Sequence, residues 1–123
     1  FNANSLTIAI SEGDNAGDAA SATGTRWNLV GNPYTGYLSA NSNASGASTF
    51  GSNNLLKSSN LNMLHANNQA IYVFNGSSYT TIGTSTSAAS AVVAPGQAFM
   101  VGGLHDDGSQ SFSFSTNIAR KKF

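Results

Sequence analysis

The sequence predicts an all-β protein, an antiparallel β-sandwich of about six to eight short strands with at most one short helix. Apolar and polar residues alternate over short segments, turns rich in Gly, Asn and Pro separate those segments, and one aliphatic cluster has helical spacing. A small β-barrel is the alternative arrangement. The sequence has no internal repeat, which excludes propellers and solenoids. We expect one β-sandwich module, residues 1–123, excised from a larger secreted protein.

Two strands and a turn are predicted in the first part of the chain. Residues 6–10 alternate as a half-buried strand with three aliphatic side chains on one face. Residues 26–30 form the next strand, which runs into the Gly31-Asn32-Pro33-Tyr34 turn. Gly31 and Asn32 both tolerate positive φ, which makes the pair suitable for a tight turn.

A long irregular stretch follows, and then the aliphatic cluster. Residues 34–54 have no sustained period, which indicates a functional loop or one that contains a short element. The aliphatic cluster in residues 55–64 predicts one or two helical turns, and Asn53 and Asn54 are the expected N-caps.

A β-hairpin is predicted between residues 70 and 82. Residues 70–75 alternate, with Ile71 and Val73 on one face and Tyr72 and Phe74 on the other. Asn75-Gly76 is a strong hairpin signal, and residues 79–82 form the return strand.

Two further strands are predicted towards the end of the chain. Pro95-Gly96 has the composition of a type II turn and leads into a strand at residues 97–101. The last strand is predicted at residues 111–115. The core is expected to contain four phenylalanines, Phe74, Phe99, Phe112 and Phe114.

Composition argues against several classes of function. Charged residues make up 8% of the chain, the formal net charge is zero and cysteine is absent. The one basic cluster, at residues 120–122, fits a strand end, a linker stub or a fragment boundary, and nucleic-acid binding is not expected. Since no apolar run is long enough for a bilayer, membrane insertion is not expected either. The surface rich in Ser, Thr, Asn and Gly favours a secreted or outer-cell-surface protein.

The sequence does not predict an enzyme. Hydrolysis of glycosidic bonds needs carboxylates that converge in a cleft, whereas the five acidic residues lie in two predicted loops. His65 and His105 lack the spacing of zinc ligands. No cofactor is expected, with a structural calcium ion as the exception to consider. Asp14 and Asp18, with Glu12 nearby, offer oxygen ligands in one loop, although a solvated acidic loop is the favoured interpretation.

Carbohydrate binding is the favoured functional hypothesis. The apolar C–H faces of pyranose rings stack on exposed aromatic rings, while their hydroxyls bond to amides and Arg. The predicted ligand-binding residues are Arg26, Trp27, Asn32, Tyr34, Tyr37, Tyr79 and Gln97, and Tyr72 and Asn75 are further candidates by residue type. Tyr37 and Tyr79 are the best candidates for exposed rings, whereas Trp27 fits a core position better than a binding platform.

Arg26 has two interpretations. Its guanidinium could clamp a sulfate or uronate of an acidic polysaccharide. It could instead cover the ring of Trp27 through a cation–π contact, and this second interpretation is favoured.

Three blocks of this chain, in order, are Trp27-Asn28-Leu29-Val30-Gly31-Asn32-Pro33-Tyr34, Ala70-Ile71-Tyr72-Val73-Phe74-Asn75-Gly76 and Ala94-Pro95-Gly96-Gln97-Ala98-Phe99-Met100-Val101. Because of these blocks, the region from residue 25 to residue 120 resembles an accessory β-sandwich domain of secreted Bacteroidetes proteins that use type IX secretion. Thr35-Gly36 departs from the family's usual second proline after Tyr34. The resemblance implies export and attachment to a polysaccharide-active enzyme or an adhesin, but it implies no ligand site.

These observations predict a non-catalytic carbohydrate-binding module that targets an attached enzyme to a polysaccharide, including an acidic marine algal one. The expected partners are that polysaccharide and the catalytic or adhesive modules of the same polypeptide. The alternative is a structural or adhesive spacer domain that binds no small ligand.

Overall fold

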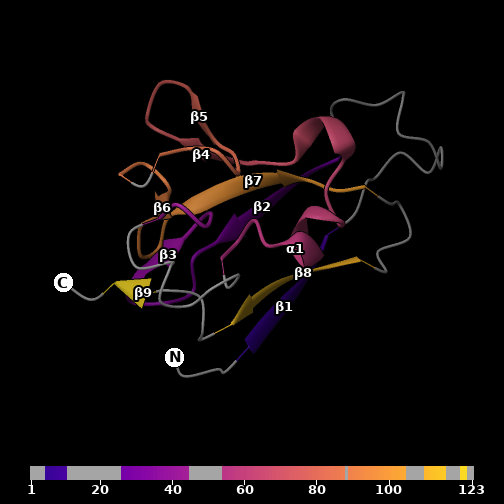
Figure 1. The fold of residues 1–123 in the computed structure, drawn as a ribbon, viewed down its shortest axis with the longest axis horizontal. Helices are drawn as coiled ribbons and strands as arrows, with labels where there is room; N and C mark the ends of the chain where they lie inside the picture. Colours follow the sequence, from indigo (N-terminus) through magenta and orange to yellow (C-terminus); the bar gives the residue numbers. More distant parts are fainter. Residues whose placement is uncertain are drawn as a thin grey trace.

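The computed structural model describes residues 5–10, 26–44, 54–87, 89–104, 110–115 and 120–121. Within these ranges the regular structure is almost entirely antiparallel β-strand, and the fold is all-β and sandwich-like, as predicted (Figure 1). The strands are β1 (Ser5–Ile10), β2 (Trp27–Gly31), β3 (Tyr37–Ser39), β4 (Ile71–Phe74), β5 (Tyr79–Ile82), β6 (Val92–Val93), β7 (Ala98–Gly102), β8 (Gln110–Ser115) and β9 (Arg120–Lys121). The helical elements are α1 (Ser58–Leu61) and the 3-10 helix η2 (Ala66–Asn68).

The strands form three antiparallel sheets. The four-stranded sheet has the order β2-β7-β4-β5, the three-stranded sheet has the order β6-β3-β9, and β1 pairs with β8. In the view of Figure 1, β1 and β8 lie below the four-stranded sheet, and β3, β6 and β9 lie at its left end. One face of the four-stranded sheet is therefore directed towards the β1–β8 pair.

The core lies between these layers. Val30, Phe99 and Val73 are in register across β2, β7 and β4, and all three side chains are buried. On the opposite layer Phe112 of β8 is also buried, and its ring centroid lies 6.2 Å from that of Phe99. This contact between two rings joins the sheets, since buried aromatic side chains contribute much of the apolar area in a small core.

Two of the predicted tight turns are confirmed, those at Asn75-Gly76 and Pro95-Gly96. The β4–β5 hairpin pairs Phe74 with Tyr79, and Gly76 has a φ of 103°. In the second turn Gly96 has a φ of 69°, and the Gln97 amide donates to the Ala94 carbonyl at 3.1 Å. Glycine is needed at both positions because other residues are strained at positive φ.

The structure differs from the sequence-based expectation in two local features. Gly31 does not adopt positive φ but ends β2, where it pairs with Ala98. The α1 helix is shorter than predicted and begins after Lys57, so the expected N-cap at Asn54 is wrong. Leu55 and Leu56 are buried in the turn before this helix. Asn53, the other expected cap, lies outside the described residues.

Three very short strands were not assigned from the sequence. β3 lies inside the stretch that showed no period, β6 precedes the Pro95-Gly96 turn, and β9 is formed by two of the basic residues at the C-terminal end. β3 pairs with both of the others. Segments of two or three residues are too short to show an alternation, so only their pairing identifies them as strands.

The side chain of Asn32 ties the end of β2 to two other parts of the chain. Its Nδ2 donates to the carbonyl oxygens of Gly36 at 2.9 Å, Val93 at 3.2 Å and Ala94 at 3.0 Å. Its Oδ1 accepts from the amide of Tyr34 at 2.9 Å. The side chain is buried, so these bonds satisfy polar groups that water does not reach. They hold β2, the start of β3 and the segment between β6 and β7 together.

Two further buried asparagines make similar links. Asn41 donates to the carbonyls of Gly83 at 2.8 Å and Thr86 at 2.9 Å. Asn60 in α1 donates to the carbonyl of Ser113 in β8 at 3.0 Å and accepts from the amide of the same residue at 3.0 Å. Side-chain amides thus join irregular segments to the sheets in a chain that has no cysteine.

We predict that Asn32→Ala lowers the free energy of unfolding by about 2 to 4 kcal/mol, because it leaves buried backbone groups without partners. Asn67→Ala is the control, since Asn67 is exposed, and it should change stability by less than about 0.5 kcal/mol. Urea denaturation measures both variants. Equal stabilities of the two variants would contradict the structural role of Asn32.

A second prediction concerns two exposed glycines that have open space around the position of a Cβ atom. Gly96→Ala should destabilise the protein by about 1 to 2 kcal/mol because its φ is positive. Gly31→Ala, at ordinary strand φ, should be neutral or slightly stabilising. The changes in melting temperature relative to the parent should therefore differ in sign or size between the two variants. A Gly96→Ala protein as stable as the parent would refute the turn assignment.

Candidate functional site: the aromatic face

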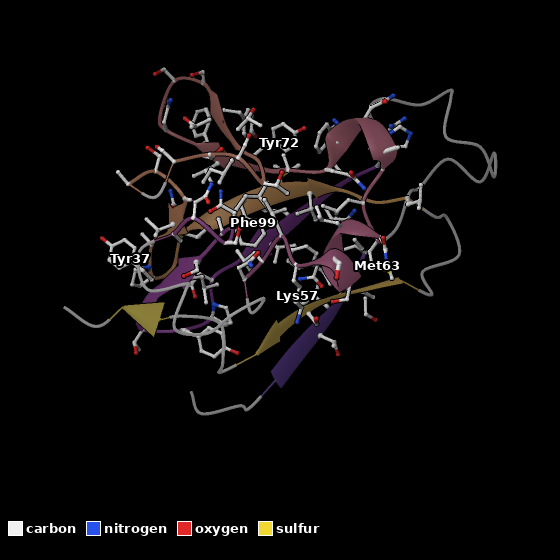
Figure 2. All side chains as sticks on the ribbon, viewed as in Figure 1. Tyr37, Lys57, Met63, Tyr72 and Phe99 are labelled. Atoms are coloured by element: carbon white, nitrogen blue, oxygen red, sulfur yellow. The ribbon has the colours of Figure 1, made fainter. Side chains whose placement is uncertain are left out.

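The outer face of the four-stranded sheet is rich in large apolar side chains. Successive side chains in a strand point to opposite faces, so the residues beside the buried Val30, Phe99 and Val73 point outward. We call this surface the aromatic face, and it consists of Trp27, Leu29, Tyr72, Phe74, Tyr79 and Met100. Figure 2 shows Tyr72 and Phe99 on opposite sides of β7.

The aromatic face is exposed to an unusual degree for a sheet surface. Leu29 is 71% exposed, Phe74 53% and Tyr79 58%. Trp27, Tyr72 and Met100 are half-buried among them. Contiguous apolar surface of this kind is uncommon on soluble proteins and marks a place where a ligand or partner binds.

Strand pairing places these residues in line across the sheet. Leu29 is opposite Met100, Met100 is opposite Tyr72, and Tyr72 is opposite Thr81. Directly opposite residues on one face are in contact distance in antiparallel pairs. The aromatic face is therefore continuous from the edge strand β2 to the edge strand β5.

An open hollow of about 330 Å³ lies on this face, lined by Trp27, Tyr72, Tyr79 and Met100. The rings of Trp27 and Tyr72 meet edge to face, with centroids 5.1 Å apart and planes at 87°. This arrangement fixes the two rings as adjoining walls. The rings of Phe74 and Tyr79 form a second pair, with centroids 5.4 Å apart, where β4 and β5 approach the hairpin turn.

Uncharged polar groups border the hollow. The Tyr72 hydroxyl accepts a hydrogen bond from Asn68 Nδ2 at 3.2 Å and keeps its own hydrogen for donation. Thr81, which faces Tyr72 across the β4–β5 pair, is exposed. These groups can bond to hydroxyls of a ligand whose apolar part lies on the rings.

The 3-10 helix η2 holds Asn68 in place beside the sheet. Asn67 N–H donates to His65 Nδ1 at 3.2 Å, and the His65 amide donates to the Gly102 carbonyl at 2.9 Å. A Cβ atom at Gly102 would lie 3.2 Å from Asn68 Cβ, which is tighter than ordinary packing. The absence of a side chain at Gly102 therefore allows η2 to approach β7 and Asn68 to reach Tyr72.

Of the predicted ligand-binding residues, Trp27 and Tyr79 lie on the aromatic face and both line the hollow. Tyr72, a candidate by residue type, lies there as well. The assignment of Phe74 to the core is wrong, because its side chain is more than half exposed. Phe99 and Phe112 are in the core as predicted, whereas the side chain of Phe114 lies outside the described ones.

The other predicted ligand-binding residues lie elsewhere. Arg26, Asn32 and Tyr34 are buried, at 4%, 5% and 3% exposure. Gln97 uses Oε1 to accept from the Ala94 amide at 2.8 Å within the Pro95-Gly96 turn. Tyr37 is half-buried on β3, and Figure 2 shows it at the left of the molecule, away from Tyr72.

Besides Phe74, two residues of the aromatic face were not expected from the sequence, Leu29 and Met100. Isolated aliphatic residues in short strands are normally assigned to the interior. Their exposure follows from the register of β2, β7 and β4, which places Val30 and Phe99 inside and their neighbours outside. Alternation along each strand was the available signal, but it requires knowing which face is covered.

The expected calcium ligands Asp14 and Asp18 lie outside the described residues. Within the described part of the chain, no group of three or more His, Cys, Asp or Glu side chains could hold a metal ion. The described helices include none with the length and apolar character needed to cross a bilayer. Comparison with family models, curated proteins and solved structures finds no match for this chain.

We predict that the exposed rings contribute little to stability. Phe74→Ala should lower the free energy of unfolding by less than about 1 kcal/mol, since it loses one cross-strand pair on an exposed surface. Phe99→Ala should lower it by about 3 to 5 kcal/mol because it leaves a cavity in the core. Chemical denaturation of the two variants tests this difference. Similar losses of unfolding free energy would mean that Phe74 is buried like Phe99, which would contradict an exposed aromatic face.

Proposed function

We propose that this chain is a non-catalytic carbohydrate-binding module that keeps an attached enzyme close to a polysaccharide. The observation that supports the proposal best is the hollow on the aromatic face, in which Trp27, Tyr72 and Tyr79 present fixed rings. The C–H faces of pyranose rings are apolar and stack on such rings, whereas sugar hydroxyls bond to hydroxyl and amide groups nearby.

The lining of the hollow favours binding over catalysis. Cleavage of a glycosidic bond requires an acid and a base or nucleophile at the scissile bond, usually two carboxylates. The side chains that line the hollow are three aromatic residues and one methionine. They can stack on a sugar, but they do not supply that pair of carboxylates.

Weak binding is sufficient for the proposed role. A module tethered to an enzyme raises the effective concentration of the substrate at the catalytic module, so even a modest affinity speeds attack on a polymer. This role places the protein outside the cell, on the surface or secreted, which agrees with the resemblance to accessory domains of secreted Bacteroidetes proteins. The partners are then the polysaccharide and the other modules of the same polypeptide.

A structural or adhesive spacer is the second candidate function. The observation that favours it is the 71% exposure of Leu29, an aliphatic side chain at the edge of the sheet. Aliphatic side chains contribute little to sugar recognition, but they are common where one protein surface covers another. In a spacer, the aromatic face would pack against a neighbouring module.

Affinity electrophoresis in gels that contain soluble polysaccharides distinguishes the two functions. The isolated chain should be retarded by at least one polysaccharide, and Tyr79→Ala should weaken the affinity about tenfold because it removes an exposed aromatic anchor. Tyr37→Ala is the matched control, since Tyr37 lies in another sheet, and it should be retarded like the parent.

Thermal melting of each variant verifies that the protein remains folded. If no polysaccharide retards the parent, the carbohydrate-binding function is contradicted and the spacer remains. If Tyr37→Ala weakens retardation as much as Tyr79→Ala, the site does not lie on the aromatic face.

A further inference from the structure

From the same site, and resting on the proposed function, we infer that the ligand is a neutral glycan chain that lies across the strands of the four-stranded sheet. The inference depends on three features of the described residues. They are the places of the cationic residues in the fold, the direction of the hollow across the sheet, and the chemistry of the polar groups at its border.

The described cationic residues do not lie on the aromatic face. Arg26 is 4% exposed, so its guanidinium is not presented at the surface. Lys57 precedes α1, and in Figure 2 it lies on the opposite side of the four-stranded sheet from Tyr72. Arg120 and Lys121 belong to β9, which pairs with β3 in the three-stranded sheet.

An acidic glycan would bind poorly to such a surface. Sulfate and carboxylate groups are recognised by charge-assisted hydrogen bonds, most effectively by the fork of donors of an exposed Arg. An anion held against the apolar rings would lose hydration without gaining an ionic partner. A neutral glycan has no such cost, because its hydroxyls can remain in water or bond to uncharged groups.

The hollow extends across the sheet rather than along one strand. Trp27, Met100, Tyr72 and Tyr79 come from β2, β7, β4 and β5, which are neighbours in that order. Three intervals between adjacent strands correspond to about 14 Å. A platform of this length accommodates several sugar units in a row, so an extended chain makes more contacts than a monosaccharide does.

The border of the hollow offers neutral hydrogen-bonding groups. The Tyr72 hydroxyl accepts a hydrogen bond from Asn68, and Thr81 is an exposed residue of the adjacent strand. Hydroxyl groups both donate and accept, and so do the hydroxyls of a sugar. Asn68 is therefore a positioning residue, which acts on the ligand through the orientation of Tyr72.

The test compares the chain in gels that contain neutral polysaccharides (mixed-linkage β-glucan, hydroxyethyl cellulose, galactomannan) and acidic ones (alginate, polygalacturonate, a sulfated galactan). We expect retardation by at least one neutral polymer. Its affinity should not change when sodium chloride is raised to about 0.5 M, because added salt weakens only interactions between charges. We expect no retardation by the acidic polymers. Oligosaccharides of the retarding polymer should compete better as they lengthen, whereas its monosaccharide should not compete.

The outcomes separate this inference from the proposed function. Retardation by acidic polymers alone, or equally by both classes, overturns the inference of a neutral ligand but leaves carbohydrate binding in place. Equal competition by the monosaccharide overturns the extended binding mode. Failure of every polymer to retard the chain contradicts both proposals.

A pair of neighbouring asparagines tests the positioning role. Asn68→Ala should weaken the affinity about three- to tenfold because it removes the hydrogen bond to Tyr72. Asn67→Ala should leave it unchanged, since Asn67 is exposed in the same 3-10 helix. Removing the hydroxyl in Tyr72→Phe should abolish the effect of Asn68→Ala, and additive losses in the double variant would overturn the role given to Asn68.

Discussion

The fold depends on buried side-chain amides that form hydrogen bonds with backbone groups left unpaired by the β-sheets. Asn32 is the central example, because it bonds to the carbonyls of Gly36, Val93 and Ala94 and to the amide of Tyr34. A buried backbone group without a partner costs about 1 to 3 kcal/mol, so such links matter in a domain of marginal stability. Charged residues make up 8% of the chain and cysteine is absent, so buried amides are an important source of links between distant segments.

This constraint also explains how the aromatic face arises. The bond from the Asn32 amide to the Gln97 carbonyl, 2.9 Å long, continues the pairing of β2 with β7 beyond Gly31. It helps to fix the register in which Val30 and Phe99 point inward. A shift by one residue would exchange the two faces of the strand and bury Leu29 instead. Turn chemistry at Asn32 thus helps to place Leu29 on the exposed face of β2.

Under the proposed function, ligand binding and stability depend on different faces of this sheet. The inner face contributes the core contact between Phe99 and Phe112, whereas the outer face presents the exposed rings of Phe74 and Tyr79. Apolar side chains that are held on a rigid sheet and left open to water are prepared for a ligand, since little ordering remains to be done on binding.

The sequence predicted the parts of the structure that depend on local chemistry. The hairpin at Asn75-Gly76 and the turn at Pro95-Gly96 were predictable because both turns need a residue at positive φ, which glycine adopts without strain. The role of Asn32 was not, because its partners at Val93 and Ala94 are distant in the sequence. Turn propensity explained why an asparagine could occupy that position, but not that its side chain links two sheets.

The candidate site was predictable in part, for a related reason. Tyr79 follows a polar turn and was expected to be exposed, as it is. Phe74 shares a strand face with Tyr72, and alternation alone indicated its true side, but residue type suggested the core. Trp27 and Leu29 share one face and Val30 occupies the other, so the segment itself does not define the inner side. Only pairing with distant strands decides between the two faces.

The most direct test of the account is a nuclear magnetic resonance titration of the ¹⁵N-labelled chain with an oligosaccharide of a neutral polysaccharide that retards it. The chain contains one tryptophan, so a single indole N–H signal reports on the hollow. The account predicts shifts of that signal and of the backbone amides around Tyr72 and Tyr79, with the amides of β3 and β9 unaffected. Shifts confined to β3 and β9, with a stationary indole signal, would contradict it.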